Sequence, residues 1–569
     1  MVILHGKVNY LRSDKLLFMN SKSEGINLRP GFLLILLFLF LGVVWASLSL
    51  PMVVNAAKYA QVSREILSSG DWIRLTIAGD AYEQKPPLLF WIGAVFFNIF
   101  GISTPVWKIA VYLVSILGIW STYRLGKLLF GKETGVLSAI FWACSLSYLY
   151  YHNDIHTDTL LADLVIFSIW QLAVFFREGK KASFYLGIIG VGLAMLSKGP
   201  VGMAIPAMAV GVHLLLHRDW KGIFHPRWLL AALIIAVMIS PALLGLYQQF
   251  GSEGIKFYFW TNNVGRITGS YYVQNPDPFF YLHTTLYMLA PFTIFALFGL
   301  YMKFRDIIMA KWKIVPSEEF FTIGGIIPYM LVLTVSKTKN PHYLMAVVPL
   351  FMILAAWFVF RLSRETSWKK THNSVIGLNL FVQIMMWTLI GLFVFWFFPE
   401  KNGWYWLIML LFLGLMGWSI LKYKGITRQV LTLTLTQLAL MFSLFFSFYP
   451  KMATYHAPFQ VAADFNKKAG PSEQIHLYLK PARYWEIFFY SEHSGKYFMA
   501  KEDLPKLLEE KKDWVFTDTE GKDQILNKLP ETEIIGEYNH RSLSQMTFPF
   551  LNPVTRASKL EKRYLLHLP

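Results

Sequence analysis

The chain has 569 residues, of which 55% are hydrophobic, 17% aromatic and only 15% charged, and its formal net charge is +18. This composition argues against a soluble protein, and repeated apolar runs of about 17–25 residues predict a polytopic helical membrane protein. The positive charge lies mostly in short loops between apolar runs, which argues against a nucleic-acid-binding protein. With one cysteine, Cys144, the chain can form no intramolecular disulfide.

The N-terminal part resembles a membrane anchor. Residues 1–30 are mostly polar and basic, and residues 31–50 are apolar without a convincing cleavage site. We therefore expect a signal anchor that remains in the protein, with segment 1–30 in the cytoplasm.

The polar stretch 51–91 separates this anchor from the later apolar runs. Pro86 and Pro87 break any helix there and stiffen the chain beside Lys85. A lysine on a stiff backbone at a membrane surface suits an anionic headgroup, although a solvated loop with a snorkelling lysine is the alternative. The following apolar run, 88–100, is short, and we expect it to lie along the outer interface.

Twelve further spans are predicted at residues 107–127, 134–151, 159–177, 183–197, 200–216, 228–248, 281–302, 320–336, 343–361, 374–398, 404–421 and 429–448. If 88–100 does not cross, every second loop carries a cluster of Lys and Arg, as cytoplasmic loops do. The anchor then makes about thirteen spans, and this odd number places the C-terminal part outside.

From about residue 451 the composition becomes that of a soluble domain, with 17 Lys and Arg against 16 Asp and Glu. Short apolar runs predict strands at 475–480, 514–517, 534–538 and 546–550, and helices are expected at 459–468, 504–511 and 522–528. Residues 451–569 are therefore predicted to form a small extracytoplasmic α/β domain.

Two acidic residues stand four apart on the predicted outer face, Asp154 and Asp158. On one helix they would share a face, and a helix N-terminus favours a carboxylate. Capping of the next span explains one of them but not both. His152 and His156 interleave with them, so the spacing is compatible with a divalent metal, and a plain interfacial histidine pair is the alternative.

Five basic residues also fall on the outer face, where positive-inside statistics make them unexpected. They are Lys85, Lys198, Arg266, Lys337 and Lys339. Arginine binds phosphate through two hydrogen bonds and lysine as a point charge, so a substrate with a lipid phosphate would explain them. External anionic headgroups are the alternative.

Aromatic residues surround Asn262, Asn263 and Arg266 in the loop after residue 248, and Trp260 is the largest of them. Aromatic side chains with Asn and Arg suit stacking on sugar rings. An aromatic belt at the membrane surface explains the same composition.

Five motifs follow one another along residues 31–450. They are Tyr59-Ala60 with Lys85-Pro86-Pro87-Leu88-Leu89-Phe90-Trp91, Asp154 with Asp158, Ser197-Lys198-Gly199-Pro200, Phe259-Trp260 with Asn263 and Arg266, and Ser336-Lys337-Thr338-Lys339 with Pro341-His342-Tyr343. In this order they resemble the GT-C-fold membrane glycosyltransferases, and most closely the aminoarabinose-transferase and protein-O-mannosyltransferase-like branch.

The resemblance implies a GT-C transmembrane domain over residues 31–450, with 51–106 as its first outer loop. It implies transfer of a sugar from a polyprenyl-phosphate donor to an envelope lipid, glycan or protein on the outer face of the plasma (inner) membrane. Basic residues would hold the lipid phosphate, and an acid would deprotonate the acceptor or stabilise charge at the anomeric carbon. Membrane lipids are the other expected partners, and a divalent metal is the one cofactor considered.

The chain departs from the family pattern at two acidic positions. Asn55 stands where an acid usually precedes the Ala-x-Tyr of the first loop, and Gln84 stands directly before Lys-Pro-Pro. An amide cannot accept a proton at neutral pH. Either Asp158, Asp154 or Glu83 acts as the base, or the chain binds its lipid without turnover. The predicted substrate-binding residues are Tyr59, Gln84, Trp260, Asn263, His342 and Tyr343.

The alternative function is a non-catalytic or degenerate polyprenyl-glycan binding protein or transporter. A glycan ligase or polymerase is a nearer alternative, because it also uses a lipid-linked donor. Transporters tend to carry charges inside the membrane and inverted repeats. Here the spans are mostly uncharged and the polar groups gather at one surface, which favours an enzyme.

Overall fold

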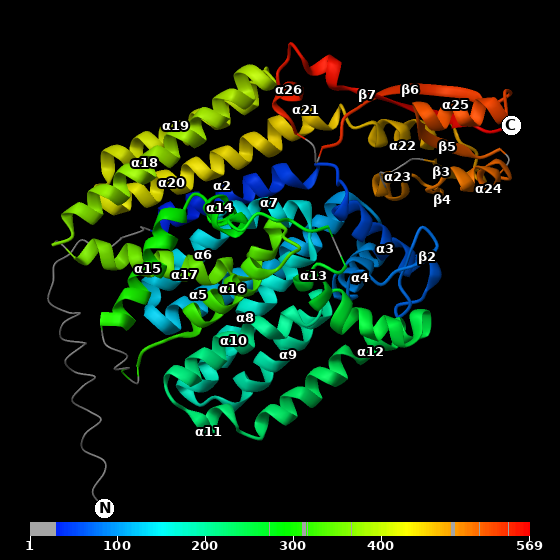
Figure 1. Cartoon of the computed structure of the whole chain (residues 1–569). Coiled ribbons are helices and arrows are strands. Elements are labelled where there is room, and N and C mark those ends of the chain that lie inside the picture. Colours follow the sequence, from blue (N-terminus) through cyan, green and yellow to red (C-terminus); the bar gives the residue numbers. More distant parts are fainter. Residues whose placement is uncertain are drawn as a thin grey trace, which may run out of the picture.

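The computed structural model describes residues 30–271, 273–309, 315, 317–365, 367–478, 484–510, 512–543 and 546–569. Apart from its last residue, the predicted cytoplasmic segment 1–30 lies outside the described residues. Figure 1 shows a large helical part and a smaller C-terminal part that contains the main sheet. The predicted class, a helical polytopic protein with a C-terminal α/β domain, is confirmed.

The apolar runs form helices. In chain order the helical part contains α2 (Pro30–Leu48), α3 (Asn55–Ser69), α4 (Leu88–Phe100), α5 (Thr104–Phe130), α6 (Lys132–Ala143), α7 (Leu146–Asp154), α8 (Thr157–Glu178), α9 (Lys181–Lys198), α10 (Val201–Leu216), α11 (Trp220–Ile223), α12 (Arg227–Lys256), η1 (Phe257–Thr261), α13 (Val264–Thr268), α14 (Phe280–Met288), α15 (Thr293–Met309), α16 (Phe321–Val335), η2 (Pro341–Val347), α17 (Val348–Arg364), α18 (Lys369–Gly391), η3 (Leu392–Phe397), α19 (Gly403–Lys422), α20 (Gly425–Phe442), η4 (Ser443–Phe448) and α21 (Tyr449–Ala453).

Within the described residues, eight helices are long and apolar enough to cross a membrane, and the bent pair α14 and α15 could make a ninth span. The helices α4, α10 and α16 are apolar but shorter. The protein is therefore a multi-pass membrane protein, while the number of thirteen crossings stays a prediction. The continuous helix expected over 134–151 is wrong, because the chain breaks between α6 and α7, where the Ser145 side chain caps α7.

Helix α8 lies at the centre of the helical part. Nearly all of its residues from Thr157 to Val174 are buried, and it packs against α5, α9 and α10. Glycines allow this close packing: a Cβ at Gly118 of α5 or Gly187 of α9 would lie within 3.0 Å of Asp163 or Leu172 of α8. The neighbouring helices therefore fix the N-terminal end of α8, where Asp158 lies.

The first loop has its own structure beside the helical part. It contains α3, a hairpin of β1 (Thr76–Ile77) and β2 (Asp80–Ala81), and α4. Glu65 of α3 holds the hairpin, because its carboxylate accepts hydrogen bonds from Thr76 Oγ1 (2.7 Å), Ala78 N (2.6 Å) and Gln61 Nε2 (2.9 Å).

The C-terminal part has a five-stranded mixed sheet in the order β4-β3-β5-β7-β6. Strand β3 is parallel to β4 and β5, whereas β7 is antiparallel to β5 and β6. Its elements are α22 (Ala457–Lys468), β3 (Ile475–Tyr478), α23 (Trp485–Tyr490), β4 (Ser494–Phe498), η5 (Lys501–Asp503), α24 (Leu504–Leu508), β5 (Trp514–Asp518), α25 (Thr519–Lys528), β6 (Glu533–His540), α26 (Phe548–Leu551), η6 (Arg556–Lys559) and β7 (Glu561–His567).

Two strands of this sheet, β4 and β7, were not expected from the sequence. The strand expected at 546–550 is wrong, because this segment forms the short helix α26 with Pro549 in its first turn. Proline is favoured at that position because its missing N–H would have no partner within the helix anyway.

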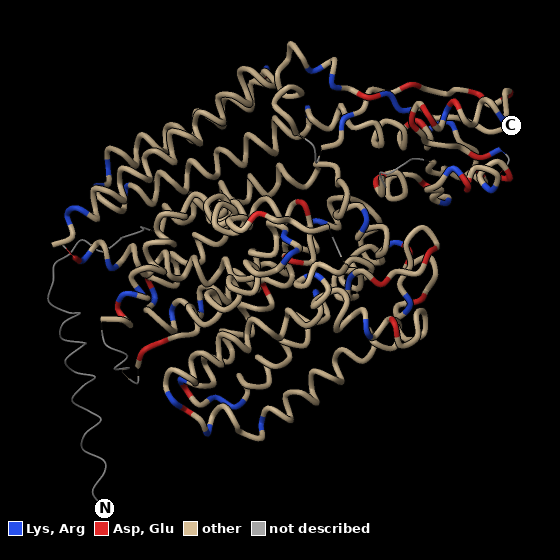
Figure 2. Tube along the Cα trace, viewed as in Figure 1, with Lys and Arg blue, Asp and Glu red and all other residues tan. Residues whose placement is uncertain are grey.

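Charged residues concentrate in the C-terminal part and at the ends of helices, as Figure 2 shows. Lys108, near the start of α5, is buried, with a relative exposure of 1%. Its ammonium donates hydrogen bonds to Ser47 O (2.7 Å), Leu50 O (2.8 Å) and Asn153 Oδ1 (2.7 Å). The cation thus satisfies carbonyls at the C-terminal end of α2, which the helix dipole favours.

We expect Lys108→Met to destabilise the protein by about 1–3 kcal/mol, because it leaves these buried acceptors without a donor while preserving the apolar stem. Thermal unfolding of the purified protein in detergent would measure the change. The matched control is Lys180→Met, because Lys180 is exposed and pairs only at the surface with Glu178. Equal melting temperatures for the two variants would contradict the expectation.

Candidate functional site

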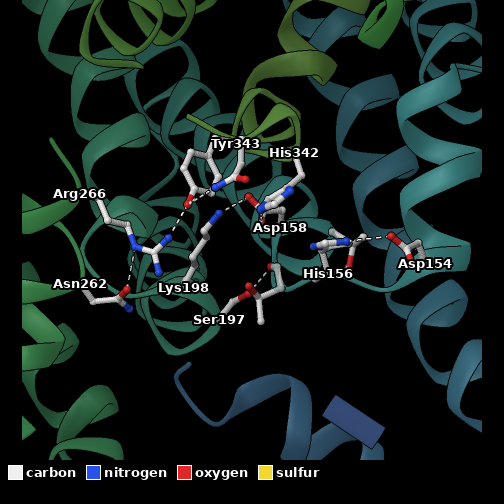
Figure 3. A network of polar contacts seen from close by, with 12 residues as sticks. Asp154, His156, Asp158, Ser197, Lys198, Asn262, Arg266, His342 and Tyr343 are labelled. Carbon is white, nitrogen blue, oxygen red and sulfur yellow. Dashed lines mark hydrogen bonds and ion pairs between the residues drawn. The ribbon is translucent and has the colours of Figure 1, made fainter. Parts of the chain in front are cut away.

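Polar side chains from several helices meet at the N-terminal end of α8 (Figure 3). Ser197 Oγ donates to Thr157 O (2.9 Å) and so ties the last turn of α9 to the first turn of α8. The next residue, Lys198, ends α9, because Gly199 adopts φ +79°, a conformation that glycine reaches without strain. This local geometry places the Lys198 ammonium beside the Asp158 carboxylate.

Asp158 is almost completely buried and forms an ion pair with Lys198. His342 Nε2 lies 3.9 Å from its other carboxylate oxygen, and the Lys198 ammonium lies 4.3 Å from the centre of the Tyr343 ring. The Asp158 side chain is therefore directed at Lys198 and His342 and does not cap its own helix.

The expectation that Asp154 and Asp158 share a helix face is wrong. Asp154 is the last residue of α7, and Asp158 lies in the first turn of α8. Ile155 between them has φ +47°, which turns the chain. Asp154 Oδ2 lies 2.9 Å from His156 Nε2, so the two acids have different partners.

Three of the five predicted phosphate ligands line one cavity of about 100 Å³. They are Lys85, Lys198 and Arg266, and Asn262, Asn263 and Tyr343 share the cavity with them. Its remaining wall is mainly apolar and comes largely from α16. Three cations near one carboxylate make this cavity suitable for an anion that carries an apolar chain.

Hydrogen bonds fix the orientation of Arg266 in this cation cavity. Its Nε donates to Asn262 Oδ1 (2.9 Å) and its Nη1 donates to Tyr343 Oη (2.5 Å), which also accepts from Asn340 Nδ2 (3.0 Å). Burial, together with the nearby cations Lys198 and Arg266, lowers the pKa of Lys85 to about 7. An incoming anion would favour the charged form of this lysine.

The other two predicted phosphate ligands do not line the cavity. Lys337 is exposed, and Lys339 Nζ donates to Asp277 O (2.6 Å). The backbone of their segment has a different role: Lys337 N donates to Ile267 O (3.1 Å) and Thr338 N donates to Arg266 O (3.0 Å). The segment therefore supports α13, which carries Arg266.

A second cavity of about 220 Å³ lies on the other side of His156. Asn55, Asp154 and His156 line it together with Asn153, Tyr150 and Tyr449. Figure 3 shows Asp154, His156, Asp158, Lys198 and Arg266 as a row that runs across the site. The two cavities lie at opposite ends of this row, with Asp158 between them.

The remaining predicted residues have separate surroundings. Gln84 Oε1 accepts from Lys58 Nζ (2.5 Å), and the Gln84 carbonyl accepts from Asn262 Nδ2 (3.2 Å). Tyr59 is buried against Phe90. Trp260 is 61% exposed, and Glu83 has no hydrogen-bond or ion-pair partner among the described residues.

Sequence reasoning missed Lys58, and it did not predict that the Asn262 side chain holds Arg266. Lys58 is largely buried, with its ammonium 5.1 Å from the Tyr82 ring centre and 5.6 Å from that of Trp485. Its position directly before Tyr59 in the first motif was the available signal. Its contact with Trp485, from the C-terminal part, had no signal in the sequence.

In the described part of the chain two groups of donor atoms could hold a metal, and the atoms of each group lie within 4.8 Å of one another. His156, Asp158 and His342 form the group at this site, and His476, Glu510 and Asp513 form the other in the C-terminal part. The expected pair of His152 and His156 is wrong, because His152 is fully buried and its Nε2 faces Asp163 (3.2 Å). Carboxylate and imidazole donors fit a divalent cation, and Asp154 would orient His156 from behind. Lys198 already balances the charge of Asp158, so this carboxylate does not need a metal ion as its partner. A bound metal therefore stays a prediction.

Comparison with known proteins supports this architecture. A sequence model of the family described as dolichyl-phosphate-mannose-protein mannosyltransferase matches residues 84–244. The undecaprenyl phosphate-alpha-4-amino-4-deoxy-L-arabinose arabinosyl transferase of Edwardsiella ictaluri is 26% identical over 337 residues, which cover 57% of this chain and 58% of the relative. The chain thus spans under two thirds of this relative's length. An uncharacterised protein of Aquifex aeolicus is 26% identical over 59% of the chain and 63% of its own length.

Among solved structures, the chain is similar to ArnT from Cupriavidus metallidurans. The crystal structure bound to undecaprenyl phosphate superposes with a TM-score of 0.73 and 17% sequence identity, and covers 94% of this chain and 98% of ArnT. The apo structure gives a TM-score of 0.71. The predicted resemblance is confirmed, and the chain has the GT-C glycosyltransferase fold in the form that ArnT shows.

Proposed function

We propose that the protein is a membrane glycosyltransferase that moves a sugar from a polyprenyl-phosphate donor to an envelope lipid, glycan or protein. The cation cavity carries this proposal, because Lys85, Lys198 and Arg266 line it together with an apolar wall and adjoin the buried Asp158. A similar fold has been crystallised with undecaprenyl phosphate, which supports a lipid of this class.

In the mechanism that we propose, the donor phosphate lies in the cation cavity, and the acceptor enters the second cavity, which Asn55 lines. One oxygen of Asp158 is occupied by Lys198 before the donor binds. The phosphate offers Lys198 another anionic partner, so this oxygen becomes accessible to the acceptor hydroxyl. The hydroxyl oxygen attacks the anomeric carbon, its proton passes to Asp158, and the bond to phosphate breaks with its electron pair on the phosphate oxygen.

A degenerate, lipid-binding protein is the second candidate, and two amides favour it. Asn55 lines the second cavity but cannot accept a proton, and Gln84 uses its amide oxygen to bind Lys58. Mass spectrometry of envelope lipids and glycans, with and without the protein, separates the candidates. A sugar modification that depends on the protein supports the transferase, and identical profiles support the binding protein.

Lys85→Ala should weaken the binding of undecaprenyl phosphate by roughly 1.5–3 kcal/mol, the scale of a charge-assisted hydrogen bond. Titration of the detergent-solubilised protein would measure the affinity. The matched control is Lys337→Ala, because Lys337 is an exposed lysine outside the cavity.

The affinity of the native protein for undecaprenyl phosphate should also fall as pH rises above about 7, because Lys85 loses its charge there. Lys85→Ala should make the affinity less dependent on pH. If Lys85→Ala binds undecaprenyl phosphate as tightly as the native protein, Lys85 is not part of the site.

Asp158→Asn should lower turnover at least about a hundredfold, because a positioned base contributes typically 10²–10⁴-fold. Binding of undecaprenyl phosphate should stay equal or become tighter, since the substitution releases Lys198 from its ion pair. Rate and affinity are measured on the same preparation. Asn55→Asp is the companion variant: it should raise activity in a degenerate transferase and do little where Asp158 is the base. Full activity of Asp158→Asn would contradict this assignment.

We further propose that the protein lies in the plasma membrane with its N-terminus in the cytoplasm and residues 451–569 outside. Loop charge supports this orientation. A cysteine at Ile102, which is 47% exposed, should react with an impermeant thiol reagent from outside, and one at Lys181 should not. The native Cys144 is buried and gives a low background. Labelling at position 181 from outside would overturn the topology.

A further inference from the structure

The short helix α23 of the C-terminal part docks directly on the first loop. The Arg64 guanidinium, on α3, donates hydrogen bonds to four carbonyls at and just after the C-terminal end of α23. They belong to Phe488 (3.3 Å), Phe489 (3.3 Å), Ser491 (2.8 Å) and Glu492 (2.6 Å). These bonds satisfy carbonyls that a helix end leaves without intrahelical donors. The dock therefore rests on specific polar contacts.

The same helix holds the backbone just before α3. Glu486 is fully buried, and its Oε1 accepts a hydrogen bond from Val54 N (2.7 Å). Tyr490 Oη accepts from Met52 N (2.7 Å). The other carboxylate oxygen of Glu486 is buried and has no hydrogen-bond partner in the described part of the chain. His456, directly before α22, places its Nε2 3.4 Å from the same Oε1, so Glu486 joins the segment before α3 to the segment before α22. Burying a carboxylate is costly, and these partners offset part of that cost.

Val54 has a backbone conformation that its side chain disfavours, with φ +44° and ψ −104°. A β-branched residue at positive φ is a true outlier, and such strain persists only where the surroundings enforce it. The Val54 carbonyl accepts from Lys58 N (3.0 Å) and so begins α3. The next residue, Asn55, lines the second cavity with Asp154 and His156.

We propose that Glu486 is a positioning residue for sugar transfer. Through Val54 it fixes the start of α3, and thereby the place of Asn55 opposite Asp154 and His156. The C-terminal part is thus a structural component of the site, which the docked α23 completes. The inference rests on the proposed transferase function for its kinetic consequence, whereas its structural consequence can be measured without any activity.

Three substitutions test the proposal in the full-length protein. Glu486→Leu removes the acceptor for Val54 N–H and the contact with His456. Glu486→Gln keeps an oxygen that can accept this bond, and Val54→Gly removes the strain, because glycine tolerates positive φ. The matched control is Glu492→Gln, because the Glu492 side chain is exposed and only its carbonyl binds Arg64.

With a polyprenyl-phosphate sugar as substrate, Glu486→Leu should lower kcat at least about tenfold and change KM for the donor less than about twofold, the pattern of a misplaced group. Glu486→Gln should remain within about threefold of the native rate. In the Val54→Gly background, Glu486→Leu should lower kcat by a smaller factor than in the native background, because the two residues act on one backbone segment. A loss in Glu486→Gln as large as in Glu486→Leu would overturn the proposal.

Hydrogen exchange of the amides of residues 52–58 provides the measurement that needs no activity. Exchange should become about tenfold faster or more in Glu486→Leu and stay unchanged in Glu492→Gln, while undecaprenyl phosphate binding is kept. Unchanged exchange in Glu486→Leu would overturn the proposal. If the native protein transfers no sugar but exchange still rises in Glu486→Leu, the proposed transferase function fails, while the role of Glu486 in fixing the start of α3 stands.

Discussion

The buried ion pair of Asp158 and Lys198 is the interaction on which the arrangement of the site depends. Removing two charges from water is costly unless geometry and further hydrogen bonds compensate. Here the hydrogen bond between Ser197 and Thr157 holds the two helix ends together, and His342 lies near the carboxylate oxygen that Lys198 does not contact. Because each charge needs the other, the end of α9 and the start of α8 are held in one register. In the proposed mechanism, the donor phosphate would compete with Asp158 for Lys198.

The site is bordered by a central helix and by shorter elements. Helix α8 is surrounded by close-packed neighbours, whereas α13 and η2 border the first cavity and α21 and the segment before α3 border the second. A rigid platform with functional groups on its loops is the usual arrangement of binding and catalytic sites. Backbone hydrogen bonds from the segment around Lys337 then hold α13, so even the residues that miss the cavity support Arg266.

The first loop connects the membrane part to the C-terminal part. Glu65 organises its hairpin, Arg64 binds the end of α23, and Lys58 lies between Gln84 and Trp485. These residues occupy one short helix, α3. Lys58 and Glu65 are seven residues apart and lie on nearly the same face, whereas Arg64 is turned about 100° away from Glu65 and contacts the end of α23. The loop is therefore an ordered connector, and α23 of the C-terminal part is the element against which it is held.

The sequence by itself determined the helical membrane class, nearly all the apolar helices and the C-terminal α/β part, because periodicity, composition and short motifs are local properties. It named five candidate cations, and the structure placed three of them in one cavity. Only the tertiary structure decided which residues meet. It separated Asp154 from Asp158 by a turn at Ile155, directed Lys339 to the Asp277 carbonyl, and brought Glu486 to Val54. Contacts across hundreds of residues depend on how helices pack, and no local pattern encodes them.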